Sequence, residues 1–439
     1  MNFLKNNRTL VFILLGVFVV SLAYSFYFRA RVEVDARAYD RIAWNLAQGY
    51  GYRELLDGPL EEDNAIMRVG PGYEIFLAVL YFIFGHSYEV VWVVHALLRT
   101  LSVLLIFLLA QNIFKEKFIG LVAALLVGFS PDLITINGLL MAETLGVLLI
   151  TLTVYFFFLC FRNPTNFWFI VALGLSLGGA VMVRTPALFL IFPILFYLGK
   201  EKKYKYGFVL LVTIGFLFTP WIVRNYFVYH TFVPTNLAYG VDLASGNHLG
   251  ATGELEPYVT NDRYLQQYGL VKGSQMLTRE ALYFIVTNPL EFFKLTIYRI
   301  SIYFSFVRPT GFWFHLQGMD RIVTLILSVL YSVFLFTLGF FGATKIKYAP
   351  PEDRTKMYQL FSMLLVMPLA IAGVIVETRY RFLVYPFFAL FAGYGINELR
   401  KKEKCLLCFA GIFFILFANT AFDIIRNLDR IMERISVLF

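Results

Sequence analysis

Residues 29–72 read RARVEVDARAYDRIAWNLAQGYGYRELLDGPLEEDNAIMRVGPG and form the first polar stretch after an apolar run. Part of this stretch repeats apolar residues at helical spacing, namely at Tyr39, Ile42, Ala43, Leu46 and Ala47. The spacing predicts a short helix that ends at Gly49. Carboxylates and guanidiniums at a bilayer surface are costly unless they are paired or used for chemistry. The stretch therefore predicts a functional loop at the membrane surface.

The composition indicates an all-α polytopic membrane protein. Of 439 residues, 59% are hydrophobic and 15% are charged, and the mean hydropathy is +0.69. Soluble domains are about 25% charged. The formal net charge is +9, but most lysines lie in short loops between apolar runs, where they set membrane orientation. We therefore expect membrane lipids as surroundings and no nucleic acid as a partner.

The apolar runs predict about eleven transmembrane helices in one domain covering residues 1–439, because about 20 apolar residues cross a bilayer. The runs at 73–84 and 292–307 are short or interrupted by charge, so we expect both helices to lie at the surface. This assignment puts every lysine-rich loop and the N-terminus in the cytoplasm. The loops 29–72 and 224–291 then lie on the extracytoplasmic face.

Asp35 lies a few residues beyond the first apolar run, and two interpretations remain open. A carboxylate there can act as a general base that takes a proton from an acceptor hydroxyl while a sugar leaves a phosphate. Partial desolvation would raise its basicity for that role. Alternatively, Asp35 is a solvated loop acid or the N-cap of the helix that follows. The residues alone favour neither interpretation.

A second carboxylate and five arginines complete the candidate site on the same face. Glu143 opens an apolar run, where an acid complements a helix N-terminus or serves as a ligand for a metal or an acceptor. Arginine suits the binding of a phosphate near a membrane because its guanidinium is permanently charged and bidentate. The candidates for the donor phosphate are Arg68, Arg184, Arg224, Arg379 and Arg381. The alternatives are structural pairing, such as Glu377 with Arg379 or Arg381, and interfacial anchoring for Arg224.

Other familiar chemical motifs are missing from the sequence. His248 has no second histidine at metal-ligand spacing, so the residues leave a divalent metal as an open question. The sequence contains no phosphate-binding Walker loop, no nucleophile elbow and no dinucleotide fingerprint. An activated sugar donor is therefore expected to arrive through the membrane.

A series of short motifs, spread over nearly the whole chain, carries a family resemblance. The motifs are Asp35 with 39–49, 68–73 leading into 76–85, Ser130-Pro131 with Glu143, 184–186, 220–225, Gly246-Asn247 and 377–381. Their order resembles that of the GT-C glycosyltransferases, specifically the family 39 and aminoarabinose-transferase-like enzymes. The resemblance implies an integral membrane enzyme that uses a polyprenyl-phosphate sugar as its donor.

The resemblance also implies roles for particular residues. Asp35 matches the catalytic acid of the first loop, Arg68 the basic residue near the donor phosphate, and the pair Arg379 and Arg381 lies at the lipid-phosphate cavity. Arg184 and Arg224 are second choices, and the expected surroundings of the acceptor are Tyr39, Asp40, Glu143, Asn247 and His248. Two departures leave metal dependence open, because Ala36 replaces the second acid of some relatives and no Asp-x-Asp motif is present.

The expected reaction is transfer of a hexosyl or pentosyl group to a hydroxyl of a glycolipid or surface polysaccharide, such as lipopolysaccharide in the cell envelope. The rival interpretations are a polytopic transporter, a lipid-linked glycan flippase and a ligase that moves a whole oligosaccharide. The charged residues lie mostly at one face, and paired broken helices in two halves are missing, which argues against a transporter.

Overall fold

The computed structural model describes residues 7–68, 70–163, 166–256, 258–307, 313–401, 406–429 and 432. Within these ranges the chain is helical, and the only β-type pairing is an isolated bridge between Glu254 and Val376. The first half contains α2 (Arg8–Phe28), α3 (Asp35–Ala47), α4 (Pro71–Phe84), α5 (Tyr88–Ile113), α6 (Lys117–Gly128), α7 (Pro131–Asn137), α8 (Glu143–Arg162), α9 (Phe167–Val183) and α10 (Ile191–Lys200).

The second half contains α11 (Tyr204–Tyr229), α12 (Ala238–Gly246), α13 (Val259–Thr287), α14 (Pro289–Phe304), α15 (Gly318–Thr344), α16 (Pro351–Ala372), α17 (Tyr385–Lys401) and α18 (Leu406–Arg426). Short 3-10 helices connect some of them, namely η1 (Leu60–Glu62), η2 (Asn64–Met67), η3 (Thr185–Leu190), η4 (Ile346–Tyr348) and η5 (Thr378–Val384). The predicted helix after the first apolar run is α3, and its chain leaves through the positive-φ residues Gly49 and Gly51.

Among the described residues, eight helices are long and apolar enough to cross a membrane, and bent helix pairs raise the number to ten. The prediction was about eleven. The three predicted spans that fall outside the eight are α6 with α7, which are bent by 52°, and the shorter apolar helices α9 and η3–α10. The predicted surface helix α14 is not a candidate span. The chain is an integral membrane protein with an all-helical fold.

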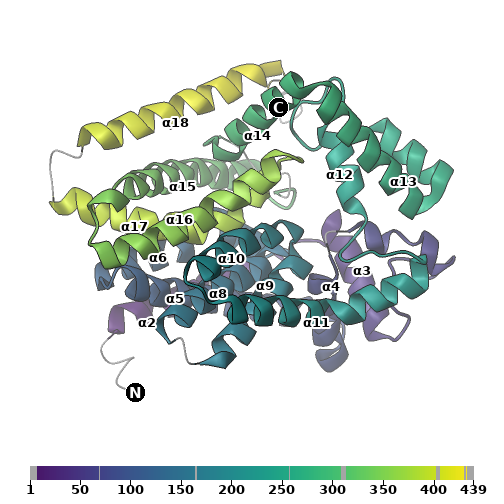
Figure 1. Cartoon of the computed structure of the whole chain (residues 1–439), viewed down its shortest axis with the longest axis horizontal. Coiled ribbons are helices and arrows are strands. Elements are labelled where there is room, and N and C mark those ends of the chain that lie inside the picture. The colour runs from purple at the N-terminus through teal and green to yellow at the C-terminus, as the bar shows by residue number, and fades with distance from the viewer. Residues whose placement is uncertain are drawn as a thin grey trace.

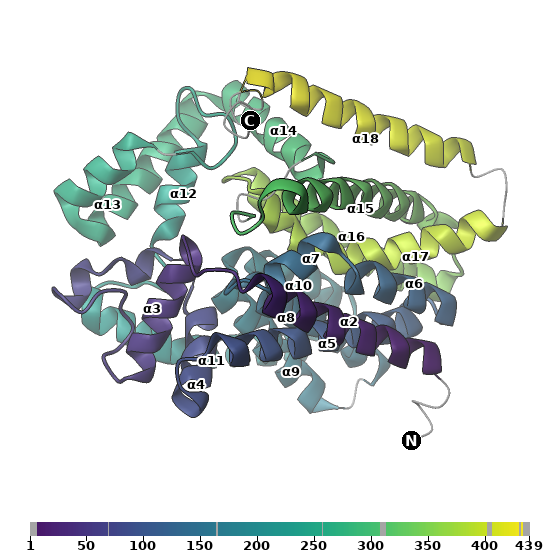
Figure 2. The same cartoon turned by 180° about the vertical axis from the view of Figure 1, so that it is seen from behind.

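The loops between these helices sort onto two ends of the bundle. Lys115 forms an ion pair with Glu352 at 3.0 Å, and Lys203 lies 4.3 Å from the ring of Phe161, so lysine-rich loops that the sequence groups together contact one another. At the other end, α3, α12 and α13 gather away from the N-terminus (Figure 1 and Figure 2). The polar first loop therefore meets the long segment 224–291 at that end.

Asp40 fixes α3 against the helices that follow it. Its carboxylate accepts hydrogen bonds from the hydroxyl of Tyr81 at 2.6 Å and of Tyr88 at 3.0 Å, and it contacts Nε2 of His86 at 2.8 Å. The sequence places Asp40 near the acceptor, but three partners occupy this carboxylate. Its role in the structure is to tie α3 to α4 and to the start of α5.

Arg99 is an exception to the expectation that charged residues gather at one face. It lies in the middle of α5 with 4% of its surface exposed. Its guanidinium donates to Oγ of Ser21 at 2.7 Å and to the carbonyl of Gly128 at 2.6 Å. These hydrogen bonds satisfy much of the donor capacity of the buried guanidinium. They also tie α5 to α2 and α6, so they support a structural role.

A close helix contact between α15 and α17 gives the first testable prediction. A Cβ atom added at Gly342 would lie 1.9 Å from the carbonyl oxygen of Phe391, whereas one added at Gly411 would have no atom within 4 Å. Gly342→Ala should therefore destabilise the protein by about 1–3 kcal/mol, because overpacking forces the helices apart. The measurement is thermal unfolding in detergent, with Gly411→Ala as the matched control. Equal unfolding temperatures for the two variants would contradict this packing.

Candidate active site

Arg379 stands at the centre of a group of carboxylates brought together from three parts of the chain. It lies on η5, and its Nη1 donates to Oδ2 of Asp35 at 2.9 Å. Its Nε lies 2.5 Å from Oε2 of Glu377 and 3.8 Å from Oε1 of Glu143. The pairing of Glu377 with Arg379, the structural alternative to phosphate binding, is therefore present. One guanidinium therefore joins the first loop, the start of α8 and the segment before α17.

Arg184 adds a second guanidinium to this group. It caps the end of α9 in an extended conformation and donates through Nη2 to Oε1 of Glu143. The side chains are 4% and 1% exposed, respectively. We call Asp35, Glu143, Arg184, Glu377 and Arg379 the ionic cluster. Buried ion pairs are weak sources of net stability because desolvation offsets their attraction, so the cluster calls for a functional explanation.

The backbone turns Asp35 toward Arg379. Asp35 is the first residue of α3, the N-cap position belongs to Val34, and no side chain forms a capping hydrogen bond there. Val34 has φ +50° and ψ −125°, a conformation that is rare and strained for a β-branched residue. The interpretation of Asp35 as a helix N-cap is therefore wrong, and its carboxylate belongs to the ionic cluster.

The electrostatic surroundings of Asp35 differ from those expected from the sequence. Burial raises the pKa of this carboxyl, but the contact with Arg379 outweighs burial and, with Arg184 and Arg68, holds the pKa below its usual value. The expectation that desolvation raises the basicity of Asp35 is therefore wrong for this arrangement. The physical reason is that a cation 2.9 Å away stabilises the ionised form more than burial destabilises it.

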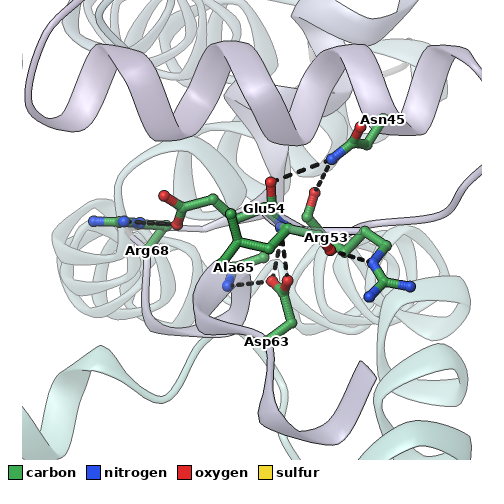
Figure 3. Close-up of polar contacts among 7 residues, drawn as sticks. Asn45, Arg53, Glu54, Asp63, Ala65 and Arg68 are labelled. Carbon is green, nitrogen blue, oxygen red and sulfur yellow. Dashed lines mark hydrogen bonds and ion pairs between the residues drawn. The ribbon is translucent and has the colours of Figure 1, made fainter. Parts of the chain in front are cut away.

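Arg68 is paired inside the first loop. Its Nη2 lies 2.6 Å from Oε2 of Glu54, and Figure 3 shows the two side chains side by side. Asp63 holds the loop by accepting from the backbone N–H groups of Glu54 at 2.8 Å and Ala65 at 2.8 Å. Arg68 remains 31% exposed. It therefore lies at the loop surface and outside the ionic cluster.

Two other arginines that were predicted to bind phosphate, Arg381 and Arg224, make contacts that hold parts of the fold together. Arg381 is 1% exposed and donates to the carbonyl of Ser305 at 2.9 Å, with Nη2 3.8 Å from Oδ2 of Asp132. Arg224 donates to the carbonyl of Tyr52 at 2.9 Å, and its guanidinium lies 5.4 Å from the ring centroid of Trp221. Arg224 thus anchors α11 to the first loop, and Arg381 is enclosed in the helix bundle.

Three other residues that were predicted to surround the acceptor also make contacts within the fold. Tyr39 is buried on α3 and packs edge-on against Tyr73, with 5.5 Å between ring centroids. Asn247 donates to the carbonyl of Gly373 at 3.2 Å and accepts from Arg299 at 3.2 Å. His248 stacks on Tyr258 with 4.0 Å between ring centroids. Asn247 and His248 therefore hold the long segment 224–291 in place.

A cavity of about 350 Å³ opens beside the ionic cluster, and Arg184 lies in its wall. Further polar groups come from Asn236, Tyr239, Asp242 and Tyr380, while an apolar side is formed by Leu188, Phe189, Ile371, Val374 and Ile375. Asp242 was not among the residues predicted for the site. The available signal was that Asp242 is the only acid between Arg224 and Gly253, on a helix of small and apolar residues.

The ionic cluster is built from carboxylates matched to guanidiniums. In the part of the chain that the structure describes, no group of three or more His, Cys, Asp or Glu side chains is arranged to hold a metal ion. Asp35 and Glu377 both approach Arg379. In this arrangement the arginines supply the positive charge.

Two comparisons with known proteins bear on this architecture. The archaeal oligosaccharyltransferase AglB from Archaeoglobus fulgidus, in complex with an inhibitory peptide and a dolichol-phosphate, superimposes with a TM-score of 0.54 over 96% of this chain at 13% identity. A second structure of the Archaeoglobus fulgidus oligosaccharyltransferase, with Zn and sulfate, gives 0.53 over 95% of this chain at 14% identity. This chain has the GT-C fold.

A family model and a third solved structure also match this chain. The family described as dolichyl-phosphate-mannose-protein mannosyltransferase matches residues 68–223. ArnT from Cupriavidus metallidurans, bound to undecaprenyl phosphate, gives a TM-score of 0.49 at 14% identity over 92% of this chain and 63% of its own. The GT-C chain spans 55% and 51% of the two archaeal structures, about half their length. No curated protein matches the sequence.

The central position of Arg379 gives the second prediction. Arg379→Gln leaves the partly buried carboxylates of Asp35 and Glu377 without their counter-charge, which should lower the free energy of unfolding by about 2–3 kcal/mol at neutral pH. Because the folded-state pKa of Asp35 is below the ordinary value of 3.8, its stabilising contribution is present above 3.8 and is lost as pH falls through the lower value. The difference between wild type and variant should therefore narrow as the pH falls below 3.8.

The measurement is denaturant unfolding in detergent at neutral pH and at low pH. Arg37→Gln is the matched control, because Arg37 lies exposed on the same helix as Asp35 and should change stability by less than about 0.5 kcal/mol. A destabilisation by Arg379→Gln no larger than that of the control would contradict the central position of Arg379.

Proposed function

We propose that this GT-C chain is a glycosyltransferase that moves a sugar from a polyprenyl-phosphate donor to an acceptor hydroxyl. The observation that carries the proposal is the shared position of Arg184. Its guanidinium belongs to the ionic cluster and also lines a cavity whose other side is apolar. A lipid phosphate has the same two-part chemistry, an anionic head on an apolar chain. A buried guanidinium suits the head because it is permanently charged and bidentate.

The comparisons support a lipid-phosphate donor. One archaeal oligosaccharyltransferase of the same fold is described in complex with a dolichol-phosphate, and the matching family is described by a dolichyl-phosphate sugar. In our proposal the phosphate binds at Arg184 and Arg379. The polyprenyl chain leaves past Ile371 and Val374 toward the bilayer.

Asp35 is the proposed general base. It takes the proton of the acceptor hydroxyl as the hydroxyl oxygen attacks the anomeric carbon of the sugar. The bond between that carbon and the phosphate oxygen breaks, and the electron pair leaves with the polyprenyl phosphate. Displacement from the opposite side inverts the configuration. Arg184 and Arg379 stabilise the negative charge that develops on the leaving phosphate, which is commonly the larger catalytic contribution.

The low pKa of Asp35 fits this mechanism if Arg379 changes partners. Without donor, Arg379 holds Asp35 ionised and weakly basic. A donor phosphate competes for the same guanidinium. As Arg379 turns to the phosphate, Asp35 loses its counter-charge, and its pKa rises because burial then dominates. The base therefore becomes stronger when the donor is bound.

The finer assignments form part of the same proposal. Arg68, at the loop surface, is the second candidate for a donor-phosphate contact, whereas carbonyl groups already occupy Arg224 and Arg381. The positive-inside rule assigns the Asp35 end of the bundle to the extracytoplasmic face and the N-terminus to the cytoplasm. The proposed acceptor is a hydroxyl of a glycolipid or surface polysaccharide of a bacterial cell envelope, and the proposed membrane is the inner membrane.

The experiment compares lipid and surface glycans by mass spectrometry in cells with wild type, without the protein, and with Asp35→Asn. We expect a glycan that is lost in the deletion and falls at least about 100-fold with Asp35→Asn, because a general base contributes about 10²–10⁴-fold. Asp57→Asn, an exposed acid in the same loop, is the matched control and should restore the glycan at equal protein level.

Two outcomes would contradict the proposal. Full restoration by Asp35→Asn would remove Asp35 as the base. If the deletion instead leaves every glycan structure intact but traps lipid-linked glycans on one side of the membrane, the protein is a flippase or transporter.

A further inference from the structure

Asp242 is a cavity-facing carboxylate that the mechanism above does not use. It lies in the middle of α12, is partly buried, and lines the same cavity as Arg184. Within the described part of the chain, its carboxylate makes no hydrogen bond or ion pair. Neither of its oxygens is among the buried side-chain atoms that lack a partner, so the carboxylate is accessible from the cavity. A carboxylate that faces a cavity beside an ionic cluster, with its hydrogen-bonding capacity unused by the protein, is available to bind a ligand.

The fold holds α12 at both ends. At its N-terminal end, the backbone N–H of Leu237 donates to the carbonyl of Ile66 at 2.9 Å, and Oγ of Ser274 donates to the carbonyl of Leu237 at 2.7 Å. At its C-terminal end, Arg299 donates to the carbonyl of Gly246. Asn247 donates to the carbonyl of Gly373, directly after α16. The position of Asp242 is therefore set by contacts from the first loop, α13 and α14.

The close packing of α12 leaves little freedom for this helix. A Cβ atom added at Gly240 would lie 2.2 Å from the carbonyl oxygen of Ser274. The helix can approach α13 this closely because position 240 has no side chain. A nine-residue helix fixed on three sides presents Asp242 to the cavity as a rigid group, as required for a binding residue.

The charges around Asp242 indicate what it can bind. Burial and the negative charge of Glu377 raise the pKa of Asp242 to about 7, against the opposing effect of Arg379. Near neutral pH this carboxyl both donates and accepts hydrogen bonds. Sugar hydroxyls, which are also donors and acceptors, match this property. An acidic sugar does not, because its carboxylate would lie against Asp242, where the negative charges of Glu377 and Asp35 already disfavour a further anion.

We propose that Asp242 binds hydroxyl groups of the transferred sugar and favours sugars without an acidic group. This inference rests on the proposed function. In a polyprenyl-phosphate sugar the ring is bonded directly to the phosphate, so a phosphate at Arg184 places the ring in the cavity that Asp242 lines. The cavity volume, about 350 Å³, lies within the range of small-molecule sites. Asp242 is a binding residue here, and the proton transfer remains with Asp35.

The test uses the full-length purified chain in lipid nanodiscs. The donors are undecaprenyl-phosphate hexoses and the corresponding undecaprenyl-phosphate hexuronate, and the acceptor is the lipid fraction of cells that lack the protein. The variants are Asp242→Asn, which preserves side-chain volume, and Asp242→Ala. Asp262→Asn, an exposed acid in the same long segment, is the matched control. A parallel measurement gives the Kd of each protein for sugar-free undecaprenyl phosphate.

For wild type we expect transfer from a neutral hexose donor at least tenfold more efficient than from the hexuronate. Asp242→Ala should raise the KM for the hexose donor by about tenfold or more, because it removes the hydrogen bonds between this carboxyl and the sugar hydroxyls. It should leave the Kd for undecaprenyl phosphate within twofold of wild type, which also shows that the variant is folded. Asp262→Asn should match wild type in both measurements.

The outcomes separate the two proposals. Equal donor KM values for wild type and both Asp242 variants would overturn the role of Asp242. That result would not contradict the proposed glycosyltransferase function. A change in the acceptor KM alone would overturn it as well, because the residue would then face the acceptor. If wild type transfers no sugar from any donor and does not bind undecaprenyl phosphate, the proposed function itself fails.

Discussion

The structure at the polar end of this bundle depends on the charge of one side chain, Arg379. Its guanidinium contacts Asp35 and Glu377 directly and lies 3.8 Å from Glu143. These carboxylates come from the first loop, the segment before α17 and the start of α8, so the interaction joins segments far apart in the sequence. Each carboxylate would be costly to bury alone. The shared cation offsets the free-energy cost of burying these carboxylates together, and it fixes where the first loop meets the helices.

The same geometry gives the cluster a chemical use. An arginine held between carboxylates can be drawn away by a stronger anion, and a phosphate is such an anion. Arg184 connects the cluster to the cavity, so an incoming phosphate meets a guanidinium at once. In the proposed mechanism, Asp35 faces the acceptor hydroxyl and Asp242 faces the sugar ring. Under this proposal, donor binding is coupled to the strength of the base.

Much of the local structure could be predicted from the sequence, because it depends on residues close together in the chain. The apolar rhythm from Tyr39 to Ala47 predicted α3, and the closeness of Glu377 and Arg379 in sequence indicated their ion pair as the alternative to phosphate binding. The charges within 292–307 correctly excluded that run from the spans. The span count was less accurate, since α6 and α7 form a bent pair and α9 and α10 are short. Length and hydropathy do not reveal such breaks.

The candidate site was harder to predict because its partners are distant in sequence. Arg379 is 344 positions from Asp35, and this contact reversed the expected shift of the Asp35 pKa. Arg224 looked like a phosphate ligand until its bond to the carbonyl of Tyr52 was seen. Asp242 was missed because a single acid in a loop carries no signal until its neighbours are known. Residue type narrowed the candidates, and tertiary contacts decided among them.

The most direct test of the central claim is a cryo-EM structure of the chain in lipid nanodiscs with bound undecaprenyl phosphate. Our account predicts the phosphate between Arg184 and Arg379, the chain against the apolar wall at Ile371, and the contact between Arg379 and Asp35 opened beyond hydrogen-bond distance. A phosphate bound elsewhere, for example at Arg68, with the pair Arg379 and Asp35 intact, would contradict the proposed exchange of partners.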